Sequence, residues 1–209
     1  MVSVIKEQDI CLSCGECCKR YWITVLPDEA KRIAKKLKIS EKKFLEEECT
    51  LLVKAYPKST FGLLTYPVAF LPARVHNLLK KISNSQAYFI IPQVVLRRQE
   101  NICTFLDDEN KCVAYSVRPE PCKLFPFIVV EGYREAYPFC ELFKKTHKKN
   151  PGPSRSYSKK LKKYFSLVSK KGFQKVWKNP PKKGLLYHSE QKIGEITLQE
   201  INEIQENSF

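Results

Sequence analysis

Near the start of the chain, apolar positions recur at the spacing of an α-helix. In residues 27–37 these apolar positions lie on one face of a predicted helix. That helix begins at Pro27, a residue that favours the first turn of a helix. Ser40 can cap a second helix over 41–49, because its side chain can accept a hydrogen bond from the first turn. This part of the chain is therefore predicted to hold two amphipathic helices.

Two more helices are predicted near the C-terminus. Residues 158–172 form a basic amphipathic pattern in which Leu161, Phe165 and Val168 face inward and Gly172 ends the helix. A last helix begins at Thr197, because the pattern that follows matches a capping box with an acidic residue three positions on.

Between these helices the pattern changes to short β-prone runs. Runs of β-branched and aromatic residues, separated by turn residues, favour strands at 88–98, 102–106, 111–115 and 125–133. The sequence DDEN at 107–110 predicts a tight turn. Residues 50–75 are apolar but interrupted by proline, and they are predicted to form core-packing coil and short helix. The chain is therefore predicted to be an α+β protein, with a small β-region, peripheral helices and a basic C-terminal helix.

Composition adds a chemical question to this outline. The chain has 209 residues and nine cysteines, an odd number that cannot pair completely within one chain. The N-terminus lacks the apolar core of a secretion signal, and the apolar stretch 61–73 is too short to span a bilayer. We therefore expect a cytoplasmic protein, in which metal or cluster binding is a more frequent use of cysteine than disulfides.

Eight of the cysteines form two groups along the chain. The first group has the spacing C-x2-C-x2-C-C, which allows a turn to direct successive sulfurs at one point. The second group is spread over a β-prone region, where a hairpin can bring its first two members together. Adjacent side chains diverge, so Cys18 is expected to serve a different site from Cys17. The predicted ligands are Cys11, Cys14, Cys17, Cys18, Cys103, Cys112, Cys122 and Cys140, whereas Cys49 is interpreted as a core residue.

Eight thiolates suit two four-coordinate zinc sites, or one iron–sulfur cluster with a separate zinc. The spacing does not choose between zinc and an iron–sulfur cluster, nor does it show which cysteines share an ion. Arg118 can offset thiolate charge and donate hydrogen bonds to sulfur, although an ordinary ion pair or a turn cap explains it equally well. Tyr115 is expected to form part of the wall around the site.

The cysteine motifs resemble those of a known family. CLSCGECC at 11–18, followed by CTFLDDENKCVAYSVRPEPCKLFPF at 103–127, is similar to the YkgJ-like, or CxxCxxCC, family of zinc- or iron-chelating proteins. The resemblance implies metal chelation by the cysteines of these motifs. Some relatives, the flagellin lysine N-methylases, are similar in the cysteine motif, which implies an alternative: an iron–sulfur enzyme, such as a protein lysine methyltransferase that uses S-adenosylmethionine, or a redox protein.

Charge is concentrated in one part of the chain. The net charge is +15, and residues 142–189 contain fifteen Lys or Arg and no Asp or Glu. Such a segment can contact RNA or the ribosome through phosphates, with interleaved aromatic residues that pack or stack. The expected contacts are Lys159, Lys160, Lys163, Lys170, Lys171, Lys175 and Lys178. The predicted division is a cysteine-cluster domain at 1–141 and a basic helical extension at 142–209, packed on or beside it.

Overall fold

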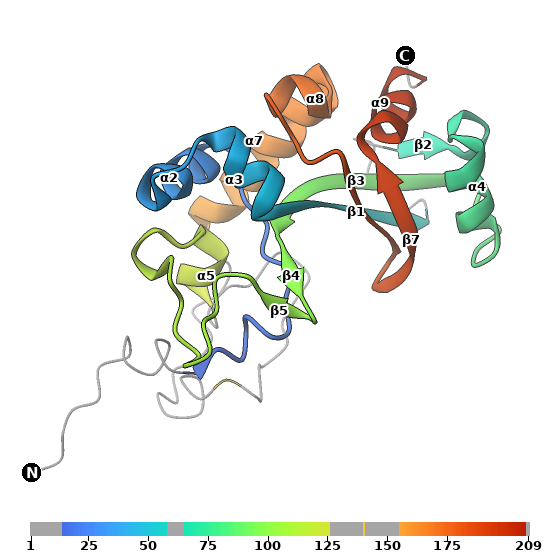
Figure 1. Cartoon of the computed structure of the whole chain (residues 1–209). Helices are drawn as coiled ribbons and strands as arrows, with labels where there is room; N and C mark the ends of the chain where they lie inside the picture. The colour runs from blue at the N-terminus through green and yellow to red at the C-terminus, as the bar shows by residue number, and fades with distance from the viewer. Residues whose placement is uncertain (1–13, 58–64, 126–139, 141–154, 208–209) are drawn as a thin grey trace, which may run out of the picture.

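A computed structural model describes residues 14–57, 65–125, 140 and 155–207 of the chain. These residues contain seven α-helices, a five-stranded sheet and a two-stranded ribbon (Figure 1), so the predicted α+β class is confirmed. The two parts of the molecule discussed below are the sheet with its covering helices, and a smaller lobe that contains most of the described cysteines.

The five strands of the main sheet come from distant parts of the chain. Their order across the sheet is β2 (Thr65–Pro67), β3 (Ala87–Leu96), β1 (Cys49–Pro57), β6 (Lys183–His188) and β7 (Gln191–Thr197). The pairing of β1 with β6 is parallel and the other pairings are antiparallel, so the sheet is mixed. The central strand is thus completed only by residues more than a hundred positions later in the sequence.

One face of the sheet forms the main apolar core. Leu51, Val53 and Ala55 of β1 alternate along the strand and are fully buried, as is Leu186 of β6. Helices α4 (Ala73–Lys80) and α9 (Leu198–Glu206) contact β7 on this side of the molecule. Burying such alternating apolar side chains is the main favourable contribution to the stability of the sheet.

Gly184 permits the close parallel approach of β6 to β1. A Cβ atom placed on Gly184 would lie 2.1 Å from the backbone oxygen of Leu51, a distance that no real contact allows. The absent side chain is therefore a requirement of the packing at this position.

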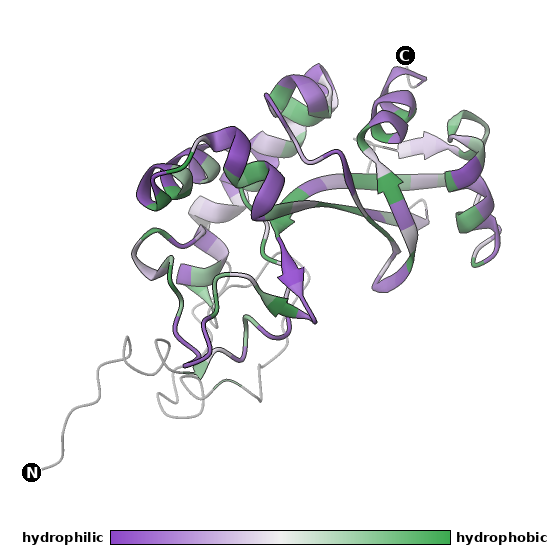
Figure 2. Cartoon of the chain, in the orientation of Figure 1, coloured by the Kyte–Doolittle hydropathy of each residue, from purple (hydrophilic) through white to green (hydrophobic). Residues whose placement is uncertain are grey.

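The local signals for helices were accurate. Helices α2 (Pro27–Leu37) and α3 (Glu41–Glu47) form as predicted, and the side chain of Ser40 accepts a hydrogen bond from the Lys43 amide at 3.1 Å. Both helices mix hydrophobic and hydrophilic residues in Figure 2, as expected for helices with one buried face.

The C-terminal helices largely follow the sequence signals, although the first begins at Arg155, three residues before the expected start at 158. Helix α7 (Arg155–Lys171) ends before Gly172, whose φ of 83° lies in the left-handed region, and the short helix α8 (Phe173–Val176) follows. Thr197 and Glu200 form the predicted capping box of α9. The predicted basic C-terminal helix is confirmed as α7.

Two predictions about β-structure were wrong. Part of the stretch expected to be coil, 50–75, contains the central strand β1, because a short apolar run does not distinguish strand from helix. Residues 111–115 form no strand, although Cys112 makes an isolated bridge to Leu106 before a 3-10 turn, η2 (Tyr115–Val117). The hairpin of β6 and β7 was not predicted. Most of the expected strand at 125–133 lies outside the described residues. The division of the chain into two domains at residue 141 stays a prediction.

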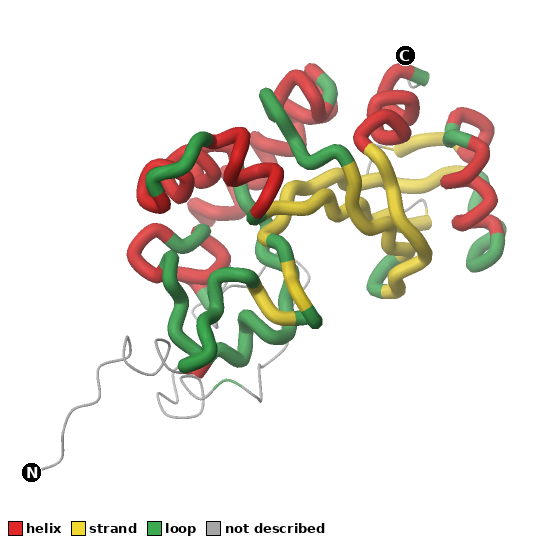
Figure 3. The backbone as a smooth tube through the Cα atoms, in the orientation of Figure 1, coloured by secondary structure: helices red, strands yellow, loops and turns green. Residues whose placement is uncertain are grey.

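The cysteine lobe consists of residues 14–22 and 97–125. It lies below the left end of the sheet in Figure 1 and consists mostly of loops and turns in Figure 3. Its regular elements are the ribbon of β4 (Arg98–Gln99) and β5 (Ile102–Cys103), and helix α5 (Glu120–Leu124). Within the described parts of the chain, no helix combines the length and the apolar character needed to cross a membrane.

Candidate metal centre

The N-terminal cysteine turn is held by backbone hydrogen bonds and by a glycine. The amide of Lys19 donates to the carbonyl of Gly15 at 3.2 Å, and the amide of Tyr21 donates to that of Cys17 at 3.0 Å. Gly15 has a φ of 66°, and a Cβ there would lie 3.1 Å from the side chain of Leu106. The turn can therefore pack closely against the loop that contains Leu106.

That loop supplies a second pair of cysteines. The amide of Cys103 donates to the carbonyl of Cys18 at 3.0 Å, which joins the two segments directly. The chain then turns back at 107–110, where the Asn110 amide donates to the Asp107 carbonyl at 3.0 Å. The predicted tight turn is thus confirmed, and it returns Cys112 to the neighbourhood of Cys103.

The fifth cysteine of this neighbourhood, Cys122, lies on α5, which a buried carboxylate fixes in place. One oxygen of Glu29 accepts a hydrogen bond from the Glu120 amide at 2.6 Å, and the other accepts from the Leu26 amide at 2.9 Å. The residue is 2% exposed, and its burial raises the pKa of the carboxyl. Glu120 also forms an ion pair with Lys160 of α7. Through these contacts α2, α5 and α7 meet beside the cysteines.

Five thiols from these three segments lie close enough to interact electrostatically. Cys17 affects the pKa of each of the others, and Cys103 affects those of two, as well as that of Cys49, on which Cys17 does not act. The set is Cys17, Cys18, Cys103, Cys112 and Cys122. Among the described residues, no three His, Cys, Asp or Glu side chains are already arranged at the spacing of metal ligands. The fold therefore gathers the donors without forming a closed coordination sphere.

Cys17 and Cys18 share a hydrogen bond between their side chains. The expectation that these adjacent thiols diverge is therefore wrong, because the tight turn directs both to the same space. The hydrogen bond from Cys18 lowers the pKa of Cys17 to about 7, with a smaller contribution from the positive charge of Arg118. The same hydrogen bond, together with burial, raises the pKa of Cys18. Cys17 is thus the thiol of the pair that ionises more readily.

Burial is the largest influence on the pKa values of the other three thiols of the group. It raises the pKa of Cys103 to about 11, and it raises the pKa values of Cys112 and Cys122 as well. A buried thiol keeps its proton unless a cation replaces it, so a metal ion is the natural counter-charge for such a set.

Two arginines flank the thiol group. The guanidinium of Arg118 lies 3.8 Å from the ring centre of Tyr115. Its charge helps to lower the pKa of Cys17, and for Cys112 and Cys122 it offsets a small part of the rise in pKa that burial causes. Tyr115 therefore holds this cation in position. Whether Arg118 donates hydrogen bonds to metal-bound sulfur stays a prediction.

Sequence reasoning missed the second arginine, Arg98. It lies 5.2 Å from the ring centre of Trp22 and donates to the Lys19 carbonyl at 2.7 Å, so it fixes the end of the N-terminal turn. Its burial lowers its pKa, while the nearby Cys103 and Cys18 favour its charged form. The only signal in the sequence was an Arg-Arg pair five residues before Cys103, which is not specific enough to identify it.

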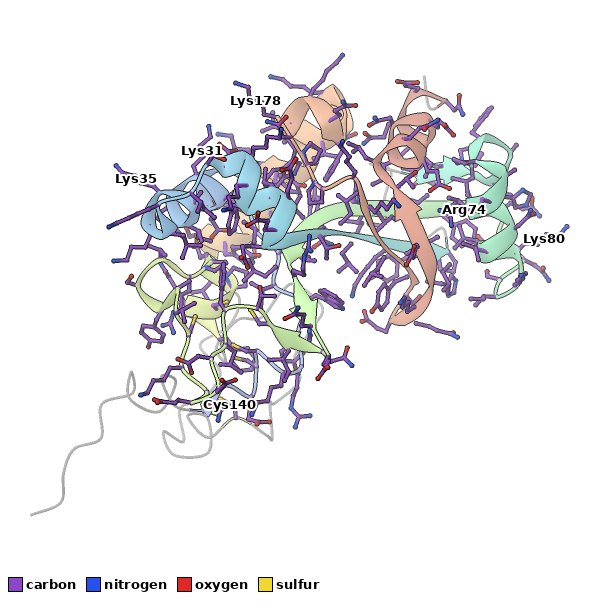
Figure 4. The ribbon with its side chains drawn as sticks, viewed as in Figure 1. Lys31, Lys35, Arg74, Lys80, Cys140 and Lys178 are labelled. Atoms are coloured by element: carbon purple, nitrogen blue, oxygen red, sulfur yellow. The ribbon has the colours of Figure 1, made fainter. Side chains whose placement is uncertain are left out.

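The other four cysteines lie outside this group of five thiols. Cys14 is half-buried at the start of the N-terminal turn, and Cys140 is buried, at the lower end of the cysteine lobe in Figure 4. Cys11 lies outside the described residues. Cys49 is fully buried at the start of β1, where burial raises its pKa, as expected for the core residue predicted from the sequence.

The lysines expected to contact nucleic acid are all exposed on or beside α7 and α8: Lys159, Lys160, Lys163, Lys170, Lys171, Lys175 and Lys178. Lys160 differs from the others because it forms the ion pair with Glu120. Three of the aromatic residues between them, Tyr164, Phe173 and Trp177, are at most 4% exposed. Of the two expected roles, packing or stacking, these three residues therefore take the packing role.

A thiol-rich site built from three separate segments defines a class of cysteine-cluster proteins with soft donors, which zinc and iron–sulfur clusters prefer. The family model CxxCxxCC, described as "Putative zinc- or iron-chelating domain", matches residues 10–141, which is more than half of the chain. The chain belongs to this family. Comparison with curated proteins and with solved structures found no match.

Proposed function

We propose that the protein binds a zinc ion or an iron–sulfur cluster through Cys17, Cys103, Cys112 and Cys122, with Cys18 beside them. One observation carries the proposal: thiols from three segments, separated by up to a hundred residues, meet within electrostatic range of one another. Chance burial of cysteine in an apolar core does not explain why these thiols lie beside two guanidinium groups, those of Arg118 and Arg98.

The donor set fits the group that the family description names. Thiolates are the preferred ligands of structural zinc and of iron–sulfur clusters, and four of them complete a tetrahedral site. A bound ion would supply the positive charge that the buried thiols lack, and it would connect the N-terminal turn, the loop at 103–112 and α5. Cys11, Cys14, Cys18 and Cys140 remain the proposed ligands of a second site or of a larger cluster.

Metal quantitation of protein purified without oxygen tests the proposal. We expect about one zinc, or the iron of one cluster, per chain for the first site, and about one further zinc if the second site is filled. Cys17→Ala and Cys122→Ala should each lose most of this metal, because a four-coordinate site does not survive the loss of a ligand. Cys49→Ala is the matched control, since it removes a buried thiol outside the group. Metal-free protein whose thiols all react, or equal metal loss in the control, would overturn the proposal.

An absorption spectrum of the same sample separates the two metals. Zinc–thiolate protein is colourless, whereas an iron–sulfur cluster absorbs in the visible range. If iron is found, binding of S-adenosylmethionine tests the enzyme alternative, because a methyl-transferring site must hold that cofactor. A colourless zinc protein would remove that alternative.

A further inference from the structure

Helix α7 presents a straight row of cations to solvent. Lys159, Lys163 and Lys170 are exposed, and their positions four and eleven residues along the helix place them on one face. Tyr157, Tyr164 and Val168, which are at most 4% exposed, occupy the opposite face. At a rise of about 1.5 Å per residue, the three lysines are spaced by about 6 and 10 Å along the helix.

Among the described residues, none of these three lysines forms an ion pair with an acidic side chain. Several cations outside α7 are instead paired with glutamates, as in Lys54 with Glu190 and Arg74 with Glu200. Lys160, on the same helix, forms an ion pair with Glu120. The sequence of α7 contains no Asp or Glu that could neutralise the row. Its charge is therefore available to an external anion.

Further cations extend this charge beyond α7. Lys175 and Lys178 are exposed at α8, and Lys31 and Lys35 are exposed on the outer face of α2. In Figure 4, Lys31, Lys35 and Lys178 project outward along the upper left of the molecule, the part in which α2, α7 and α8 lie. The amino-terminal end of α7 is close to α2, because Glu29 and Asp28 act on the charge of Lys160. A surface of this kind attracts a polyanion over several ångströms.

The chemistry of the row excludes some partners. Its aromatic neighbours Tyr157, Tyr164, Phe173 and Trp177 are buried, and Phe165 is partly buried against the core. The row therefore offers cations with few stacking platforms, and a single strand would gain little from it. Its outer face carries lysines in place of the apolar residues that insert into a lipid surface. A duplex fits better, because it presents about one phosphate charge per 1.7 Å of its axis and needs no base contact to be bound.

We propose that the outer face of α7, with Lys159, Lys163 and Lys170 at its centre, binds the phosphodiester backbone of a nucleic-acid duplex without reading its sequence. RNA and DNA duplexes share this chemistry. No thiol contributes to this surface, although α7 reaches the cysteine lobe through the ion pair of Lys160 with Glu120.

Binding of labelled 20-base-pair RNA and DNA duplexes, and of single strands of the same length, tests the proposal across a range of salt concentrations. The triple variant Lys159→Gln, Lys163→Gln and Lys170→Gln should bind duplexes roughly tenfold more weakly at low salt, with a salt slope reduced by about 2 to 3. The matched control is Lys80→Gln, Lys81→Gln and Lys192→Gln. It removes the same charge from exposed positions, and Figure 4 shows Lys80 at the far end of the molecule. Thermal unfolding should confirm that both variants fold.

Each outcome of these binding measurements either supports the proposal or overturns it. Loss in the α7 variant alone, with similar affinity for the RNA and DNA duplexes, supports a phosphate-binding surface. Equal loss in the control would show that only net charge matters, and it would overturn the proposal. Tighter binding to single strands, a large preference for one kind of duplex, or binding to phosphatidylserine vesicles in place of duplexes would overturn it as well.

Discussion

The main sheet and the cysteine lobe are stabilised in different ways. The sheet buries complete rows of apolar side chains, and residues such as Val53 and Leu186 have no exposed surface. The lobe is built mostly from turns, and it leaves Ile102 39% and Val113 61% exposed. Apolar burial therefore accounts for the sheet, whereas the lobe has little core of its own apart from residues such as Phe105 and Ala114. A region of this kind depends on cross-links, which the gathered thiols can provide.

Removing the metal should produce the largest difference between the two regions. If an ion links the three cysteine segments, chelation should speed hydrogen exchange at the Cys103, Val113 and Cys122 amides by about a thousandfold. The amides of β1 and β3 should change little, because their burial does not involve the ion. Exchange measured with and without a chelator checks this. A uniform change across both regions would contradict the separation.

The reverse experiment weakens the sheet and spares the lobe. Gly184→Ala should lower the free energy of unfolding by roughly 2 to 3 kcal/mol, because the new Cβ meets the backbone of Leu51. Gly194→Ala is a matched control, since its Cβ would meet only the end of the flexible Leu78 side chain, at 2.9 Å. Denaturant titration measures both. The metal content of folded Gly184→Ala protein should equal that of the wild type, and a lower content would show that the regions are coupled.

The smallest expected effect concerns the cap of α9 and depends on pH. Burial alone would raise the pKa of Glu200, but hydrogen bonds from Arg74 and Thr197 lower it overall. The stabilising contribution is therefore present above the ordinary value of 4.5 and is lost as the pH falls through the lower folded value. Glu200→Gln should cost about 0.5 kcal/mol at neutral pH, because Gln can still complete the capping box but loses the ion pair with Arg74. The difference from wild type should shrink in acid, and a constant difference between pH 7 and acid would refute the assignment.

Local features of the fold could be predicted from the sequence, and long-range ones could not. Pro27, Ser40 and the pair of Thr197 and Glu200 act within one helical turn, so their signals were sufficient. The strand β1 was missed because its identity depends on pairing with β6, which the pattern of residues 49–57 does not contain. Propensity is weak evidence for a strand whose partners are remote.

Part of the candidate site could likewise be predicted from nearby residues, whereas the part that depends on long-range contacts could not. The turn at 107–110 allowed the approach of Cys103 and Cys112 to be predicted from nearby residues. The approach of Cys17 and Cys122 to them depends on the hydrogen bond from Cys103 to Cys18 and on the carboxylate of Glu29, which joins residues 91 positions apart. No spacing rule along the chain encodes either contact.

The parallel pairing of β1 with β6 has a consequence for how the chain is made. During synthesis, the edge of β1 that faces β6 stays unpaired until residues 183–188 have emerged, long after the segment matched by the family model is complete. A bare edge next to buried Leu51 and Val53 is a template for association with other chains. A fragment that ends near residue 141 would keep that edge permanently, so the chain has to be expressed beyond its cysteine motifs if the protein is to stay monodisperse.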